Sequence, residues 1–96
     1  AYAAHYLGEC TTLDVRHIAH SWAGLRTFAP DRLPVIGASR QTEGFFWLAG
    51  LGGFGIQTSP SVGQLAAALL LGADLPDNLN LAGIDVTGFS PSRLNP

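Results

Sequence analysis

Charged residues are scarce in this sequence of 96 residues. Lys, Arg, Asp and Glu together supply 12% of the chain, whereas 47% of it is hydrophobic; a typical domain carries about 25% charged residues. A free-standing domain this small has a high surface-to-volume ratio and needs polar residues to cover it. We therefore expect another part of a protein to cover much of the surface. The chain also lacks methionine, so it does not begin with an initiator residue, and we interpret it as a piece of something larger.

Basic residues, cysteines and long apolar runs are also few. The five basic residues are scattered and the net charge is −2, so no basic stripe is present to neutralise phosphates and we expect no nucleic-acid partner. The single cysteine, Cys10, cannot form an internal disulfide, which favours a reducing, cytoplasmic setting. The longest apolar run, residues 65–71, is far shorter than the ~20 residues of a membrane span.

Neither a metal site nor a catalytic nucleophile is indicated. His5, Cys10, His17 and His20 do not have the spacing of a usual metal site, and His17 and His20 on a strand would point to opposite faces. The serines near residue 60 lack a G-x-S-x-G elbow. We predict no metal ligand and assign no catalytic residue.

The first third of the chain predicts a helix followed by extended chain. Residues 1–9 have a helical composition. The mixed alternation over 13–20 is compatible with a strand of moderate burial, and 21–28 continues in extended form. Ala29-Pro30-Asp31-Arg32 predicts a turn, because proline presets its backbone angle and aspartate bonds its own backbone.

Two apolar runs follow, residues 33–36 and 45–49, joined by a polar link over 37–44. They predict a hairpin-like or crossing pair of strands with an exposed loop. The second run has no alternation, which is typical of an interior strand covered on both faces.

A glycine-rich turn and an apolar helix come next, and the rest of the chain is organised around them. Four of the six residues from Gly50 to Gly55 are glycine. Thr58 or Ser59 is expected to cap a helix with Pro60 in its first turn, ending near Leu71 before Gly72. Residues 73–96 are expected to form loops.

The glycine turn allows three interpretations. Gly50-x-Gly52-x-x-Gly55 formally matches the dinucleotide-binding fingerprint, but an expected helix start near residue 58 and the lack of a following strand ending in an acidic residue argue against it. The glycines alternatively serve only to make a tight turn. In the third interpretation they let a flat ligand approach the backbone, and the helix N-terminus favours an electron-rich or anionic ligand atom.

Arg26 is the one arginine set in an apolar extended run. A buried guanidinium needs a partner, so one interpretation is an ion pair with Asp31 or Asp14, or plain exposure on a strand face. The other is a bidentate clamp for a substrate carboxylate, which the planar guanidinium suits better than lysine does.

Two stretches, WAGLRTFAPDRLPVIG and GFFWLAGLGGFGIQTSPSVGQLAAALLLG, together resemble the C-terminal part of the FAD-dependent D-amino-acid oxidase family. That family includes glycine and sarcosine oxidases and D-amino-acid dehydrogenases, and the GGFGIQTS segment is most similar to the D-arginine dehydrogenase-like branch. The likeness covers roughly residues 9–94, including Glu9-x-x-Thr12 and a closing Ser-Pro-x-Arg-Leu. The combination of these motifs is specific, whereas each alone is weak.

The resemblance implies FAD as cofactor and a role for each matching residue. Arg26 would bind the substrate α-carboxylate, and the carbonyl of Gly53 would accept a hydrogen bond from the substrate amine. The helix dipole would stabilise negative charge on the reduced flavin after hydride leaves the substrate Cα. The implied substrate contacts are Arg26, Gly53 and Gln57, and the implied cofactor contacts are Arg26, Gly52, Gly53, Phe54, Gly55, Ile56, Gln57 and Thr58.

The family's own dinucleotide fingerprint and its middle substrate residues have no match in this chain. We therefore expect an α+β fragment: antiparallel strands, one interior strand and a helix that completes a FAD/NAD(P)-binding α/β domain supplied elsewhere. Residues 1–40 would belong to the substrate-binding sheet and its connection, and 41–96 to the FAD-binding domain.

The implied activity is oxidation of the CH–NH2 group of an amino acid, a D-amino acid by the resemblance, with the isolated 96 residues inactive. Its partners would be the N-terminal part of the same enzyme and a small amino-acid substrate, with a membrane or quinone acceptor possible, and the choice between oxygen and a quinone as electron acceptor stays open. The alternative is a non-catalytic fragment or small binding module whose glycine turn is only structural.

Overall fold

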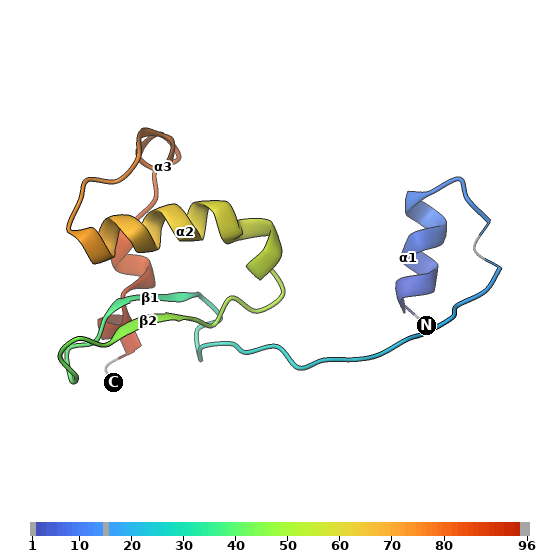
Figure 1. Ribbon diagram of the computed structural model, residues 1–96, viewed down its shortest axis with the longest axis horizontal. Coiled ribbons are helices and arrows are strands. Elements are labelled where there is room, and N and C mark those ends of the chain that lie inside the picture. Colours follow the sequence, from blue (N-terminus) through green and yellow to red (C-terminus); the bar gives the residue numbers. More distant parts are fainter. Residues whose placement is uncertain (1, 15, 95–96) are drawn as a thin grey trace.

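The computed structural model describes residues 2–14 and 16–94. Figure 1 shows helix α1 (Tyr2–Cys10) apart from all other elements, at the far end of an extended segment. The radius of gyration is 17.9 Å, whereas a compact chain of this length has about 13 Å. We call the described residues up to 27 the arm and residues 28–94 the body.

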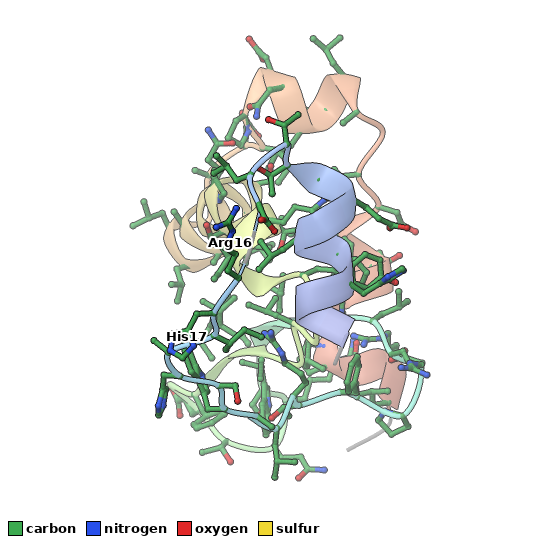
Figure 2. All side chains as sticks on the ribbon, turned by 90° about the vertical axis from the view of Figure 1, so that its right-hand side faces the viewer. Arg16 and His17 are labelled. Atoms are coloured by element: carbon green, nitrogen blue, oxygen red, sulfur yellow. The ribbon has the colours of Figure 1, made fainter. Side chains whose placement is uncertain are left out.

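The arm confirms the predicted helix but not the predicted strand. Residues 11–14 and 16–27 form no strand, and their side chains are mostly exposed, with Trp22 at 83%. Extended chain becomes a strand only by pairing, and the one sheet in the described part of the chain consists of β1 and β2. Figure 2, viewed from the α1 end, labels Arg16 and His17 on this segment.

The body is built on a hairpin of β1 (Val35–Ala38) and β2 (Phe46–Ala49), which confirms the expected strand pair. The strands are antiparallel, with Val35 opposite Ala49. Strand β1 is buried, but β2 is not covered on both faces as expected, since Leu48 is 50% exposed. A lone two-stranded sheet leaves each strand as an edge, and α2, η1 and η2 all pack on β1.

Helix α2 (Gly55–Leu71) lies beside the hairpin and packs on β1 (Figure 1), and its buried Leu65 and Ala66 pack with Ile36 and Leu79 to form the core. It begins at Gly55, so the predicted start near residue 58 is wrong, and no side chain caps it. Its end is confirmed: Gly72 has φ 61° and its N–H donates to the Ala68 carbonyl.

The C-terminal quarter is not the loop that the sequence predicted. It contains helix α3 (Asp77–Leu81) and two 3-10 helices, η1 (Val86–Phe89) and η2 (Pro91–Leu94). Short helices of this kind show no periodicity that a sequence pattern can detect. Asp85 caps η1 by accepting from the Thr87 N–H at 3.0 Å.

The small α+β architecture agrees with the expected fold class. Within residues 2–14 and 16–94, no helix has the length and apolar character needed to cross a bilayer.

Candidate functional site

The glycine turn joins β2 to α2, and two of its glycines are required by the chain itself. Gly50 and Gly52 have φ of 71° and 55°, a left-handed conformation that side chains rarely adopt. A Cβ at position 52 would also collide with the ring of Phe28, and one at position 50 would lie 3.4 Å from the Ala29 nitrogen. The segment 28–29 thus packs directly against the turn.

The same contact brings Arg26 to the turn. The Gly52 N–H donates to the Thr27 carbonyl at 3.1 Å. Arg26, Leu25 and Thr27 line one side of a shallow hollow of about 380 Å³, and residues 49–52 line the other. Arg26 is exposed, which was one of the alternatives, and the alternative of an ion pair with Asp14 or Asp31 does not form. Those carboxylates bind Arg16 and Arg93 instead.

Three backbone N–H groups at the start of α2 are unpaired. Phe54, the residue before the helix, has no side-chain oxygen to cap it. Within the described part of the chain, the N–H groups of Gly55, Ile56 and Gln57 have no hydrogen-bond acceptor, whereas that of Thr58 donates to the Phe54 carbonyl at 2.9 Å. This end of the helix also carries the positive end of the helix dipole. It is therefore suited to an electron-rich or negatively charged atom.

Gly53 differs from Gly50 and Gly52 because nothing in the described chain requires glycine at this position. Its φ is outside the left-handed region, and a Cβ there would meet no atom within 4 Å. Gly55 also has no positive φ, and a Cβ there would make only ordinary contact with Leu51 at 3.6 Å. The open space above Gly53 allows a flat group to lie on the backbone.

The structure removes one argument against the dinucleotide fingerprint but supplies another. The helix begins at the third glycine, Gly55, and not near residue 58 as expected, so no segment separates the turn from the helix. However, β2 pairs in an antiparallel hairpin, and no strand follows α2 in the described residues. The βαβ unit of the fingerprint is therefore not formed here.

Comparison with known proteins identifies the family. A family model described as FAD dependent oxidoreductase matches residues 1–69. The chain belongs to this family of FAD-dependent oxidoreductases. The resemblance inferred from the sequence motifs is confirmed, and so is FAD as the cofactor on which the family depends.

Individual relatives are much longer than this chain. A hydrogen cyanide synthase subunit HcnC of Pseudomonas aeruginosa is 32% identical over 80 residues, which are 83% of this chain and 18% of the relative. The tRNA 5-methylaminomethyl-2-thiouridine biosynthesis bifunctional protein MnmC of Paracidovorax citrulli is 42% identical over 64 residues, 64% of this chain and 10% of the relative. Its counterpart in Verminephrobacter eiseniae is 38% identical over 66 residues, 67% of this chain and 11% of the relative. The chain thus matches between a tenth and a fifth of each relative's length.

The residues of this family member fit one edge of a flavin. The three unpaired N–H groups can donate to the electron-rich edge of the ring, and the open backbone at Gly53 gives a flat ring access. Thr58 differs from residues 55–57 in its contacts. Its hydroxyl donates to the Phe54 carbonyl at 2.7 Å, and its side chain lines an apolar groove of about 340 Å³ beside α2.

Phe28 and Arg93 were not singled out in the sequence, and Asp31 was considered only as a turn residue and as an alternative partner of Arg26. Phe28 packs on Gly52, and the Arg32 guanidinium lies 4.8 Å from its ring centroid. Arg93 binds Asp31 at 2.6 Å, and this hydrogen bond lowers the pKa of Asp31 from its ordinary 3.8 to about 2. The motifs P-D-x-L-P and S-P-x-R-L contain this pair, but nothing in either motif indicates that they meet. No group of His, Cys, Asp and Glu in the described residues is arranged to hold a metal ion.

Proposed function

We propose that this chain supplies the substrate-carboxylate and flavin-edge contacts of a longer FAD-dependent enzyme that oxidises the CH–NH2 group of an amino acid. The observation that carries the proposal is the hydrogen bond from Gly52 to Thr27, which places Arg26 beside the glycine turn. A cation exposed in a hollow next to the ring-binding backbone suits a substrate that bears both a carboxylate and an amine. The family motifs favour a D-amino acid.

Each residue then has a distinct task. Arg26 binds the substrate carboxylate through two parallel N–H···O bonds and so orients the Cα. The carbonyl of Gly53 accepts a hydrogen bond from the substrate amine, and Gln57 lies near the same substrate. The N–H groups of residues 55–57 donate to the electron-rich edge of the flavin. When bound, FAD supplies the hydride acceptor.

The remainder of the same enzyme is the proposed partner. The groove beside α2 is lined mainly by apolar side chains, including Phe28, Leu51, Phe54 and Val62, and a groove of this kind is costly to leave in water. Residues 41–96 would complete the FAD-binding domain there, and residues 1–40 would join the substrate-binding sheet. The partner part would also bring the dinucleotide-binding motif.

A second candidate is a non-catalytic module in which the glycine turn is only structural. The need for glycine at positions 50 and 52 favours it, because it comes from their left-handed backbone and, at position 52, from the Phe28 ring, with no ligand involved. It gives no reason for glycine at position 53 or for an arginine exposed in the adjacent hollow. The two candidates therefore differ in what Arg26 should do.

The test is Arg26→Ala in the complete polypeptide, with Arg16→Ala as the matched control, since Arg16 is an exposed arginine of the arm. The parent is first screened with D- and L-amino acids and with amines that lack the carboxylate. We expect Arg26→Ala to raise KM for the accepted amino acid about 100-fold, as for loss of a charged bidentate contact, with flavin content unchanged. Equal kinetics for the two variants would contradict the proposal.

A further inference from the structure

The turn before β1 is tied to the far end of the body by a single arginine. Arg93, in η2, donates from Nε to Asp31 Oδ2 at 2.6 Å and from Nη2 to Asp31 Oδ1 at 3.1 Å. Its Nη2 also donates to the Leu33 carbonyl at 2.9 Å, and its Nη1 to the Ser90 carbonyl at 3.1 Å. One planar guanidinium therefore bonds to the turn before β1, through Asp31 and Leu33, and to the carbonyl of Ser90 just before η2.

The pair is more shielded from water than the arginine–aspartate pair of the arm. The side chains of Arg93 and Asp31 are 15% and 35% exposed, whereas those of the Arg16–Asp14 pair in the arm are 85% and 72% exposed. Asp31 additionally accepts from the Leu33 N–H at 3.1 Å, and the Arg32 N–H donates to the Ala29 carbonyl at 2.9 Å. A two-point guanidinium–carboxylate contact fixes orientation as well as distance, so residues 29–33 are held in one conformation.

The other end of the same segment is held by the glycine turn. Phe28 and Ala29 pack against Gly52 and Gly50, and the Thr27 carbonyl accepts from Gly52. Residues 27–33 are thus clamped at both ends, and Arg26 immediately precedes the clamped segment. The exposed residues of the arm before Arg26 make no comparable contact with the body.

We propose that Asp31 and Arg93 form a positioning pair for the substrate site. By holding residues 27–33 in place they fix the position of Arg26 relative to the glycine turn. This position determines the affinity of Arg26 for the substrate carboxylate. The pair itself touches neither substrate nor cofactor. This inference rests on the proposed role of Arg26, and it extends the site to a C-terminal segment that the sequence alone assigned to a loop.

The experiment uses the complete polypeptide and the variants Arg93→Gln, Arg93→Lys and Asp31→Asn. Arg16→Gln is the control, because it removes another ion pair of 2.6 Å that lies in the arm. Propanoate, a small carboxylate without an amine, is titrated while the flavin absorbance is followed. We expect its Kd to rise about tenfold for Arg93→Gln and Asp31→Asn, less for Arg93→Lys, and not at all for Arg16→Gln. Flavin content should stay at the parent level.

A double-mutant cycle separates positioning from general stability. If Arg93 acts through Arg26, adding Arg93→Gln to Arg26→Ala should weaken propanoate binding no further. Additive effects, or lost flavin with unchanged propanoate affinity in the flavin-loaded fraction, would overturn the positioning role. Arg93→Lys provides the same comparison if Arg93→Gln does not fold.

The cycle also distinguishes the two proposals. If Arg26→Ala weakens propanoate binding and Arg93→Gln does not, the proposed function stands and the positioning role fails. If Arg26→Ala has no effect on propanoate, the role of Arg26 fails and the positioning role fails with it.

Discussion

At the scale of a single residue, Gly52 shows that a glycine of a cofactor-binding motif can be required by packing within the chain itself. Gly52 is left-handed and faces the Phe28 ring. We expect Gly52→Ala to destabilise the protein by about 1–3 kcal/mol, the range for an overpacked site. Gly63→Ala is the control, because a Cβ at position 63 meets no atom within 4 Å and alanine favours helix. Urea unfolding of both variants measures the difference, and equal midpoints would show that Phe28 does not restrict position 52.

At the same scale, the lowered pKa of Asp31 predicts that the stability of the folded chain depends on pH. Its pKa is about 2 in the folded chain, against an ordinary 3.8 for the unfolded chain. As pH falls, the unfolded state therefore binds the proton first, so the contribution to stability is complete above about pH 4 and is lost toward pH 2. The difference in Tm between the parent and Asp31→Asn should be constant near neutral pH and shrink below pH 4. A difference that persists unchanged to pH 2 would exclude the carboxylate as its source.

At the scale of elements, two hydroxyl groups near the start of α2 donate to carbonyls of earlier residues, that of Thr58 to Phe54 and that of Ser59 to Ile56. Pro60 lies inside the helix and has no N–H to give the Ile56 carbonyl, which accepts from the Ser59 hydroxyl at 2.9 Å instead. Figure 1 shows that the helix bends near this end, as expected at a proline.

We expect Ser59→Ala to cost about 1 kcal/mol, the typical value of one hydrogen bond. In a Pro60→Ala background, the backbone N–H of residue 60 would donate to the Ile56 carbonyl. Ser59→Ala should then lower the free energy of unfolding by less. Thermal unfolding of the four proteins gives the coupling. Equal costs in both backgrounds would show that the hydroxyl does not replace the missing N–H.

The same two hydroxyls explain why the helix start was predicted wrongly. Thr58 and Ser59 can accept from N–H groups ahead of them as caps or donate to carbonyls behind them within a helix. The local sequence permits either role, and in the structure both hydroxyls donate to carbonyls of earlier residues within the helix start. The hairpin and the Gly72 stop were predictable because each depends on a local pattern of apolar residues or on one left-handed glycine.

Other features could not be predicted because they depend on contacts between residues that are far apart in the sequence. The alternation over residues 13–20 indicated a strand, but no pairing strand is present in the described chain. Of the candidate site, the neighbourhood of Arg26 and the glycine turn was expected from the family motifs. The link between Asp31 and Arg93 was not, because 62 residues separate them.

At the scale of the whole molecule, the exposed arm makes a prediction about proteolysis. The five basic residues are all arginines, at positions 16, 26, 32, 40 and 93, so trypsin has few sites. In the isolated 96-residue chain, Arg16 should be cut first, because cleavage needs exposed, extended backbone and Arg26 precedes a segment bound to the glycine turn. In the complete polypeptide Arg16 should be cut much more slowly if the arm joins a larger sheet. Mass spectrometry of timed digests measures both rates, and unchanged rates would contradict that partnership.

The long separation between Asp31 and Arg93 also sets an order of events during synthesis. Contacts between sequence neighbours form before contacts that close a long loop. The turn at Asp31 and the hairpin leave the ribosome before Arg93, which lies 62 residues after Asp31. The Asp31 carboxylate therefore has only its local contact with Leu33 until α2 and η2 have been made, so its contact with Arg93 closes after the hairpin.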